Sequence, residues 1–437
     1  MLGNNSSGRE RLSQESRNAS FDCFSASFFF FVIWCAGVLV PLYPFLKSFD
    51  GFSLIWGFNF VDKNSAVIKA LLLYAAALVL VLAGSYLGQK FQLNHPSRSR
   101  YILEPKRLLQ LSLLFTLAGV LAFVTLLILL GGLSGLLQGA SDRIRAFAGL
   151  NGLFLLQNLL LSVSLAWYIR LTGELNKSKL ERSLFWLYFI GSILICALQG
   201  QKSTIFIAVL SLLVVRHYRV KPVSLIKGAV LGVVMFVSLM AYHVFKQEFL
   251  VTGTISFFNE DQSVFSSLIN LLVIQFTGNL MQLQTMSVLI DAMPEGLPWQ
   301  NGSTLLMIAL ILVPSALFPG KPLTAAGVFT GAFWPNMWLL QGTTMPPGVF
   351  GEFYMNFGFV GVLLGALLLG FVWGRLYGAV VGNPQSDRAL GIYALTIASM
   401  LHLFRGELSS VLLLLASIWL PFLLLSSRRE SPVNHPN

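Results

Sequence analysis

The chain has 437 residues, of which 55% are hydrophobic and only 11% are charged, and its mean hydropathy is +0.74. Soluble domains carry about 25% charged residues, so this composition excludes a soluble globular protein and indicates a polytopic membrane protein. The net charge of +11 comes from short basic clusters between apolar runs. Such clusters are typical of topology signals and of contacts with anionic lipid headgroups, and they argue against nucleic-acid binding.

The apolar segments follow one another along the chain at lengths that suit membrane crossings, since about 20 helical residues span roughly 30 Å of hydrocarbon. The predicted crossings are residues 24–46, 66–88, 108–131, 152–171, 183–199, 203–216, 225–246, 351–374, 389–404 and 409–427. The segments 183–199 and 203–216 are close enough in sequence to form a tight helical hairpin. Because the sequence is polar before residue 24, we expect the first helix to be an uncleaved signal anchor.

The basic residues predict the orientation of these crossings. With the N-terminus in the cytoplasm, 20 Lys and Arg fall on the cytoplasmic side and nine on the outer side, as the positive-inside rule requires. Between Lys246 and Arg375 the only Lys or Arg is Lys321. We therefore expect this long basic-poor stretch to face the periplasm or the cell exterior.

The predicted fold is all-α, an integral membrane protein with about ten transmembrane helices and a large outer loop region. The apolar run 303–318 either is re-entrant or pairs with 268–290 to make twelve crossings. The predicted organisation is a polar cytoplasmic N-terminus (1–23), a bundle of seven helices (24–246), a periplasmic loop region (247–350), C-terminal transmembrane helices (351–427) and a cytoplasmic tail (428–437).

The outer loop region is rich in aromatic residues and poor in charge, so we expect it to fold against the membrane surface. Its tryptophans either form an interfacial aromatic belt or offer flat apolar surfaces on which sugar rings can pack. Trp334 and Trp338, with Pro335 and Asn336 between them, are the candidates for a sugar-binding surface.

Basic side chains recur at the predicted outer ends of the helices. They are Arg143 and Arg145, Lys202, His243 and Lys246, and His402 and Arg405. Ionisable groups are costly near hydrocarbon unless they face an anion or water, and Arg offers planar bidentate contacts to phosphate. These residues either bind a phosphate or pyrophosphate together, or pair locally with Asp142, Glu248 or Glu407, or extend their charged ends to water.

Two acids lie beside predicted outer helix ends in the C-terminal part of the chain. Glu352 begins the helix at 351, and Glu407 follows Arg405 and Gly406. A carboxylate in a partly desolvated site can act as a general base. A favourable interaction with the helix dipole or a local ion pair explains either residue equally well.

Nothing in the sequence predicts a metal or a cofactor. The cysteines, Cys23, Cys35 and Cys196, lie in or beside apolar segments without metal-ligand spacing. There is no Walker loop, no GxGxxG motif after a strand and no DxD motif.

Four stretches resemble bacterial O-antigen polymerases, also called oligosaccharide repeat unit polymerases. They are GEFYMNFGFVGVLLGALLLG at 351–370, HLFRGELSS at 402–410, VPSALFPGKP at 313–322 and, more weakly, GQKSTIFIAVLSLLVV at 200–215. The chain departs from the family at Ser315, where relatives often carry an Arg after the loop proline.

The resemblance implies a membrane-embedded glycosyltransferase that extends undecaprenyl-pyrophosphate-linked oligosaccharide at the periplasmic face of the inner membrane. It implies that Glu352 or Glu407 is the catalytic base. The residues expected to bind the pyrophosphate are Arg143, Arg145, Lys321, Arg405, His243 and Lys246, and those expected to bind sugar are Trp334, Trp338, Tyr354 and Asn356. Membrane lipids, a chain-length regulator and a flippase are the expected partners.

Two other functions fit the same features. An O-antigen ligase, which transfers the polymer onto lipid A core, also needs a large periplasmic loop and cations for pyrophosphate. A lipid-linked oligosaccharide flippase belongs to another class, but transporters commonly carry ionisable residues near the bilayer midplane and paired repeats. No predicted helix here carries a charge at its centre, which favours the polymerase.

Overall fold

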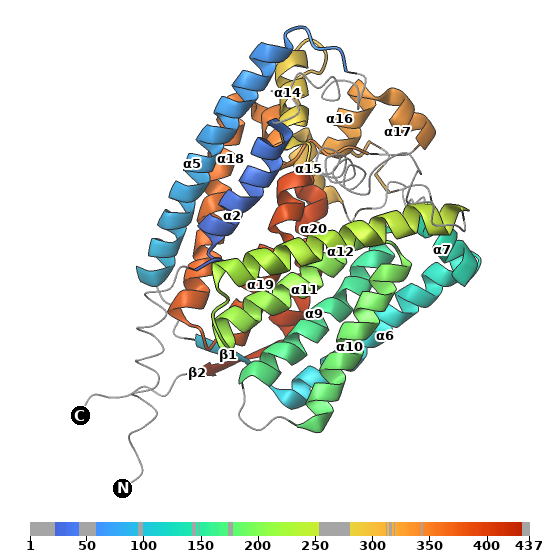
Figure 1. Ribbon diagram of the computed structural model, residues 1–437, viewed down its shortest axis with the longest axis vertical. Coiled ribbons are helices and arrows are strands. Elements are labelled where there is room, and N and C mark those ends of the chain that lie inside the picture. Colours follow the sequence, from blue (N-terminus) through green and yellow to red (C-terminus); the bar gives the residue numbers. More distant parts are fainter. Residues whose placement is uncertain are drawn as a thin grey trace, which may run out of the picture.

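The computed structural model describes most of the chain, and it is mainly helical (Figure 1). The described residues are 22–42, 58–94, 99–141, 146–147, 149–173, 178–252, 280–311, 313, 317–318, 320–341 and 344–430.

The helices coincide with the predicted apolar segments and add short helices in the outer region. In chain order they are α2 (Ala26–Trp34) with the π-helical turn η1 (Cys35–Leu39), α5 (Lys63–Asn94), α6 (Pro105–Leu129), α7 (Leu133–Ser141), α9 (Asn151–Gly173), α10 (Lys179–Leu198), α11 (Lys202–Arg219), α12 (Leu225–Thr252), α14 (Gln282–Ala292), α15 (Ser303–Leu310), α16 (Ala325–Phe333), α17 (Pro335–Gln341), α18 (Val349–Gly382), α19 (Asp387–Arg405) and α20 (Leu408–Leu425).

Six of the described helices are long and apolar enough to cross a membrane: α5, α6, α9, α10, α18 and α20. Shorter apolar helices occupy Ala26–Leu42 and Leu225–Met235. The chain is therefore suited to a multi-pass arrangement. Within the described part of the run 303–318, the helix α15 ends at Leu310, so it is too short for a crossing of its own.

The helices α5 and α18 lie side by side and parallel (Figure 1), and glycine brings their backbones into contact. A Cβ atom added to Gly84 or Gly88 would lie 2.3 or 2.1 Å from a carbonyl oxygen of α18, and one added to Gly370 or Gly374 would lie 2.2 or 2.0 Å from a carbonyl oxygen of α5. The spacing of four within each pair is that of the small-residue motif of membrane helix pairs.

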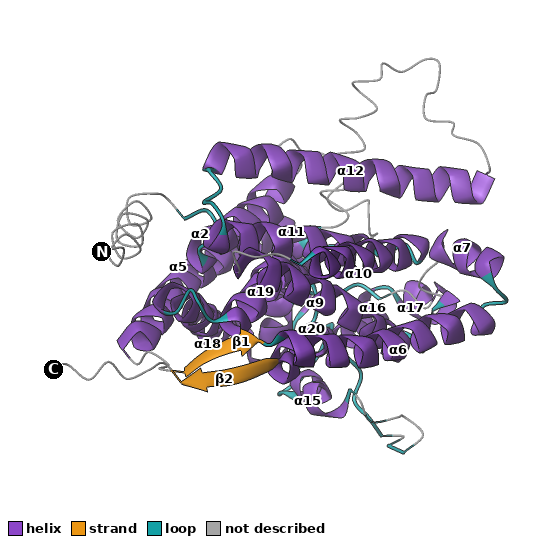
Figure 2. Ribbon diagram, turned by 90° about the horizontal axis from the view of Figure 1, so that it is seen from below, coloured by secondary structure: helices purple, strands orange, loops and turns teal. Residues whose placement is uncertain are grey.

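The helices α6, α9, α10 and α11 form the other part of the bundle, and α12 runs along its side against α7 and α11 (Figure 2). The helix α9 is largely buried. The hydroxyl of Ser162 on α9 donates to the carbonyl of Ile418 on α20 at 2.8 Å, so α9 joins this group to the C-terminal helix.

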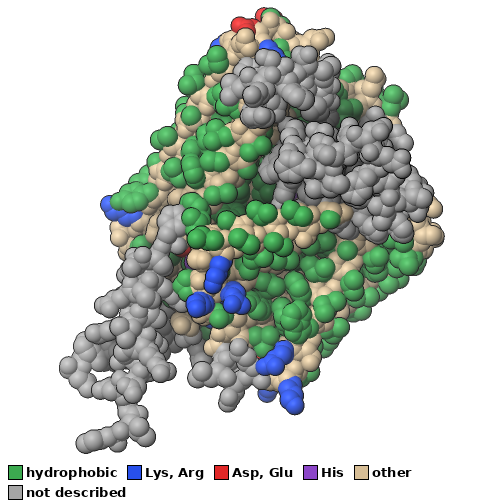
Figure 3. Space-filling model, in the orientation of Figure 1, with side chains coloured by type: hydrophobic (Ala, Val, Ile, Leu, Met, Phe, Trp, Pro, Cys, Tyr) green, Lys and Arg blue, Asp and Glu red, His purple; other side chains and the backbone are tan. Residues whose placement is uncertain are grey.

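A two-stranded antiparallel sheet departs from the all-α prediction. β1 (Ser99–Leu103) pairs with β2 (Ser426–Glu430), with Leu103 opposite Ser426. The sheet ties the connection between α5 and α6 to the segment that follows α20. Most of the Lys and Arg visible in Figure 3 lie towards this end of the molecule, whereas hydrophobic side chains cover its flank.

An aromatic core lies where α2, α5, α18 and α19 meet. Phe350 lies within about 6 Å of Phe30, Tyr74 and Phe404, measured between ring centroids, and all four side chains are buried. This core fixes the start of α18 against the end of α19. It therefore positions the two sequence motifs that carry Glu352 and Glu407.

Candidate functional site

A break inside α18 separates its first turns from the rest of the helix. Phe357 has φ −140° and ψ 16°, and Gly358 has φ 62° and ψ −149°, so neither residue is helical. The conformation of Gly358 is accessible essentially to glycine alone. Residues 349–356 are consequently a short, fully buried helix, distinct from the longer segment that follows. The crossing predicted at 351–374 lies within α18, but its helix is interrupted at this point.

The loop between α14 and α15 holds the end of the short helix in place. The Gln300 N–H donates to the Met355 carbonyl at 2.9 Å, and the Gly302 N–H donates to Oδ1 of Asn356 at 2.7 Å. Nδ2 of Asn356 donates to Oγ1 of Thr304 and to the carbonyl of Glu352. Because both of its donors are used here, Asn356 stabilises the break, and its predicted contact with sugar stays a prediction.

Glu352 points from the short helix towards the connection between α19 and α20. Its side chain is completely buried, and Oε2 accepts a hydrogen bond from the Leu408 N–H at 2.6 Å. Oε1 has no hydrogen-bond partner among the described residues. An unpaired buried polar atom typically costs about 1–3 kcal/mol, so Oε1 is the oxygen of this carboxyl that can still accept a hydrogen bond.

Both oxygens of Glu407, in contrast, are engaged. Oε2 accepts from the Ala326 N–H at 2.7 Å, and Oε1 accepts from the Ser410 hydroxyl. Glu407 is the N-cap residue of α20, and Ala326 lies in the first turn of α16. Its carboxyl therefore joins the starts of two helices, where exposed N–H groups favour a negative charge.

Arg405, at the end of α19, is partly buried. Among the ion pairs of the described residues none involves Arg405, and Glu407 uses its carboxyl on α16 and α20 instead. Asp142 and Glu248, the other predicted local partners of the outer cations, lie where side chains are outside the described structure. A partly buried guanidinium without a described carboxylate is suited to an anionic ligand.

Lys321 has contacts at the end of α15. Its ammonium donates to the carbonyls of Val313 at 2.9 Å and Ile311 at 3.3 Å. These carbonyls follow the last residues of α15, where backbone acceptors lack helical partners. Lys321 therefore closes the end of α15, and its predicted role in binding pyrophosphate stays a prediction.

The other predicted cations cannot be placed around the site. Arg143 and Arg145 lie outside the described residues. His243 and Lys246 belong to α12, but the positions of their side chains are likewise outside the description.

The predicted sugar-binding aromatics lie in different surroundings. Trp334 lines a pocket in the outer region. Trp338, on α17, packs against the glycine face of α16 at Gly327 and Gly331. Tyr354 is buried on the short helix and packs against the Trp299 ring, with centroids 5.7 Å apart.

A chain of buried polar side chains in the α9 to α11 region was not predicted from the sequence. Gln199 donates to Gln157 at 2.6 Å, Gln201 donates to Gln199 at 2.5 Å, and Thr204 donates to Gln201 at 2.9 Å. All four side chains are buried. The signal was present in the sequence, because polar amides inside apolar segments need partners from neighbouring helices.

Comparisons with protein families, with curated proteins and with solved structures find no match for this chain. The described residues offer a Glu352 carboxyl oxygen without a hydrogen-bond partner, the Arg405 guanidinium at the end of α19, and a short helix that ends at the break in α18.

Proposed function

We propose that this protein is a polymerase of undecaprenyl-pyrophosphate-linked oligosaccharide repeat units, a glycosyltransferase of the bacterial inner membrane. The observation that supports the proposal most is a contact between two of the segments that resemble O-antigen polymerases, 351–370 and 402–410. The bond between Leu408 and Glu352 joins 402–410 to 351–358, and the third segment lies close by, because Glu407 bonds to Ala326 shortly after Lys321.

In the proposed reaction, Glu352 is the general base. Oε1 takes the proton of an acceptor sugar hydroxyl, and the hydroxyl oxygen forms a bond to the anomeric carbon of the donor. The bond between that carbon and the pyrophosphate oxygen breaks, and undecaprenyl pyrophosphate leaves with the bonding electron pair. Arg405 stabilises the charge on the leaving group, because a guanidinium can make two parallel hydrogen bonds to phosphate oxygens.

Glu352 is preferred to Glu407 as the base because of what each carboxyl already binds. A base must reach the proton that it removes, within about 3 Å or through one water. Glu407 has both oxygens committed to protein donors, whereas Glu352 keeps one oxygen without a described partner. We assign Glu407 a positioning role, through its contacts with α16 and α20.

The proposed topology has ten crossings, with both termini in the cytoplasm and the site at the periplasmic face. The shortness of α15 favours ten crossings over twelve. The sheet of β1 and β2 and most basic residues would then lie on the cytoplasmic side. Cysteine labelling at Glu295 in the outer region and at Lys106 beside β1, with a membrane-impermeant reagent, tests this orientation. Labelling only at residue 295 in intact spheroplasts supports it.

The direct test of function is the polysaccharide ladder of a strain lacking the gene. Single-repeat lipopolysaccharide supports the polymerase. Loss of all attached O-antigen favours a ligase, and translocation of a lipid-linked repeat by vesicles containing only this protein favours a flippase. Complementation with Arg405→Ala and with Arg143→Ala should fail to restore chain extension, with the variant still in the membrane. A near-normal chain length in both variants contradicts the pyrophosphate assignment.

A further inference from the structure

The short helix at the start of α18 folds back against the segment that follows the break. A Cβ atom added to Gly361 would lie 2.5 Å from the carbonyl oxygen of Phe353, and one added to Gly365 would overlap the Phe353 ring. In an unbroken helix, residues eight and twelve positions apart are separated by about 12 and 18 Å along the axis. Residues 349–356 therefore form an arm that lies beside the start of the long segment and does not extend it.

The contacts of Phe350 give the direction of this arm. The Phe30 ring lies 6.2 Å from the Phe350 ring and 5.4 Å from the Trp373 ring, measured between centroids. A straight helix would separate residues 350 and 373 by about 35 Å, too far for one ring to contact both. The Phe350 ring also lies 6.0 Å from Tyr74, inside α5. The arm therefore runs from the break back towards the interior of the bundle.

The helix α14 descends along α5 to the same depth. Near its end, the Asp291 carboxylate accepts from the N–H groups of Val61 at 2.8 Å and Asp62 at 3.0 Å, just before α5 begins. At its start, the carbonyl of Gln282 accepts from the Tyr74 hydroxyl at 3.1 Å. One end of α14 is thus level with the beginning of α5, and the other end is level with Tyr74.

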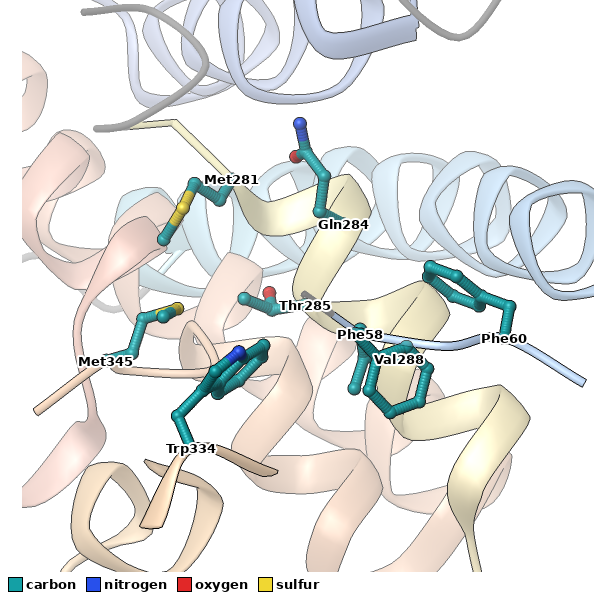
Figure 4. A pocket seen from close by; sticks show the side chains of 8 residues that line it. All are labelled: Phe58, Phe60, Met281, Gln284, Thr285, Val288, Trp334 and Met345. Carbon is teal, nitrogen blue, oxygen red and sulfur yellow. The ribbon is translucent and has the colours of Figure 1, made fainter. Parts of the chain in front are cut away.

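The start of α14 also holds the residues that lead into the arm. The Thr285 hydroxyl lies 3.1 Å from the carbonyl of Pro347, to which it can donate. Met281 and Thr285 face Met345, which precedes the arm, across a small pocket (Figure 4). The chain is therefore already inside the bundle when the arm begins, and the arm rises from there to the break.

The charged residues of α5 and α18 mark the limits of the membrane. Lys69 and Lys90 on α5 are exposed and 21 positions apart, with no charged residue between them. Their separation of about 32 Å matches the roughly 30 Å of bilayer hydrocarbon. Arg375 ends the uncharged part of α18, and its guanidinium lies 5.2 Å from the centroid of the Phe91 ring. Both helices therefore reach the same inner boundary.

The glycine contacts show which residues of the two helices are level. The added Cβ of Gly84 meets the carbonyl oxygen of Leu367, and that of Gly370 meets the carbonyl oxygen of Val81. The average of these two pairs places Gly358 level with about residue 72 of α5, roughly 5 Å past Lys69. The break consequently lies close to the outer boundary of the membrane, and the arm that folds back from it lies inside.

We propose that the arm is a re-entrant helix that holds Glu352 inside the membrane, and that Phe353 is the residue that positions it there. Phe353 contacts Gly361 and Gly365, which are three and seven positions beyond Gly358, so the carboxyl-bearing residue lies about 5–10 Å below the break. The inference rests on the proposed function in taking Glu352 as the base. It adds that the reacting group of the substrate must enter the membrane to reach this base.

A double-mutant cycle tests the folded-back arm, with the full-length protein in lipid nanodiscs. Contacting residues show non-additive effects on stability, whereas residues more than about 7–10 Å apart have additive effects. Gly365→Ala should lower the unfolding temperature, because its methyl group meets the Phe353 ring. Phe353→Leu in the same chain should recover part of that loss. If Gly365→Ala alone yields no folded protein, its rescue by Phe353→Leu is the same test.

The matched control is Phe359→Leu combined with Gly365→Ala. Phe359 is nearer to residue 365 in sequence than Phe353, but it is 47% exposed and the atoms nearest to the added Cβ all belong to Phe353. Its effect should add to that of Gly365→Ala. Additive effects of Phe353→Leu and Gly365→Ala would overturn the folded-back arm.

The positioning role is tested by chain extension in vitro, per mole of folded protein. A shift of a reacting group by about 1 Å can cost about 100-fold in rate. Gly365→Ala should therefore lower kcat by up to about 100-fold with little change in KM, and Phe353→Leu in the same chain should restore most of the rate. A purely structural role would reduce the amount of folded protein and leave kcat unchanged, and that result would overturn the positioning role.

Nitroxide labels test the depth. Glu295, Phe357 and Leu364 are exposed and are each replaced by a labelled Cys after the three native cysteines are changed to Ala. At residue 364, level with the Phe353 contacts, dissolved oxygen should relax the label more than a water-soluble nickel complex does, and at residue 295 the order should be reversed. The label at 357 should lie between the two. Equal nickel accessibility at 295 and 364 would overturn the placement inside the membrane.

These results are separable from the proposed polymerase function, because the stability cycle and the nitroxide measurements need no substrate. A normal polysaccharide ladder in the deletion strain removes the polymerase and leaves a measured re-entrant arm standing. Loss of the ladder together with additive stability effects removes only the arm.

Discussion

The backbone N–H of Leu408 donates to Oε2 of Glu352 at 2.6 Å, across 56 residues of sequence. Leu408 is the first residue of α20, so its N–H has no partner within its own helix. The bond satisfies that donor and orients the Glu352 carboxyl. It leaves Oε1 as the oxygen without a described partner, from which the first prediction follows.

Replacement of Glu352 by Gln should abolish chain extension without unfolding the protein. The amide oxygen can still accept from Leu408, but an amide cannot take a proton from a hydroxyl. General base catalysis contributes about 10²–10⁴-fold in rate, so we expect a loss of at least about 100-fold. The measurement is polymer length in a complemented deletion strain, together with the amount of protein in the membrane.

The matched control is Glu295→Gln, because Glu295 is exposed in the turn after α14. This variant should support normal polymer. Polymer of wild-type length from Glu352→Gln would exclude Glu352 as the base.

Replacement of Glu407 by Gln should have a much smaller effect on chain extension than replacement of Glu352 by Gln. In Glu407→Ala the Ala326 N–H and the Ser410 hydroxyl lose their shared acceptor, and the loss of such a contact costs about 1–3 kcal/mol. Glu407→Gln keeps an oxygen for one of them and should recover much of the stability and most of the polymer. Thermal unfolding in detergent and the polysaccharide ladder measure the two effects. A Glu407→Gln protein that is stable but inactive would reverse the assignment of base and positioning residue.

The positions of the helices follow from the sequence, whereas the details of the site do not. Apolar runs dictate helices in a membrane protein because backbone groups must be paired within the segment. Local pattern does not predict the break at Gly358, since a single glycine inside an apolar run is also compatible with an unbroken helix. The break depends on contacts from elsewhere in the chain, namely the Gln300 N–H on Met355 and the Gly302 N–H on Asn356.

The sheet and the roles of two charged residues show the same limit. β1 and β2 have five residues each, and their pairing depends on where α5 and α20 end. The sequence placed Glu407 beside Arg405, which suggested a local ion pair, yet its carboxyl bonds to Ala326, 81 residues away. Lys321 likewise bonds to carbonyls at the end of α15, a contact that depends on how the loop folds back.

Gly358→Ala should destabilise the short helix that carries Glu352. The space around Gly358 would admit a methyl group, since an added Cβ would lie 3.4 Å from the Trp299 ring, so the penalty arises from the backbone. Its φ of 62° with ψ of −149° costs a non-glycine residue about 1–3 kcal/mol. We expect reduced thermal stability and reduced chain extension.

Gly232→Ala on α12 is the control, because nothing lies within 4 Å of an added Cβ there. Unchanged stability of Gly358→Ala would contradict the glycine-specific break.

Asp22 should make the stability of the protein depend on pH. Burial by itself raises the pKa of the Asp22 carboxyl, but hydrogen bonds from His217, Tyr218 and Tyr377 outweigh it and lower the pKa below its ordinary value of 3.8. The ionised form is therefore stabilised in the folded state. This contribution is fully present above about pH 4 and is lost as the pH falls through the lowered pKa.

The measurement is thermal unfolding of the wild type and of Asp22→Asn between pH 3 and pH 7. The wild type should be more stable at neutral pH, and the difference should shrink as the pH falls below about 4. A difference that grows with acidification would contradict the assigned pKa direction.

Alanine should destabilise the protein at Gly374, which lies in the contact between α5 and α18, and stabilise it at Gly191, which lies outside that contact on α10. A Cβ on Gly374 would lie 2.0 Å from the carbonyl oxygen of Ser85, so Gly374→Ala must push the helices apart. Overpacking of this kind costs about 1–3 kcal/mol. Gly191 on α10 has nothing within 4 Å of an added Cβ, so Gly191→Ala should stabilise its helix by up to about 1 kcal/mol through helix propensity.

Thermal unfolding of both variants in the same detergent measures the expected loss of stability in Gly374→Ala and the expected gain in Gly191→Ala. Because α18 also carries the short helix with Glu352, Gly374→Ala should reduce chain extension as well, and Gly191→Ala should not. A Gly374→Ala protein as stable as the wild type would mean that α5 and α18 do not approach at backbone contact, since no rotamer of alanine can avoid the carbonyl of Ser85.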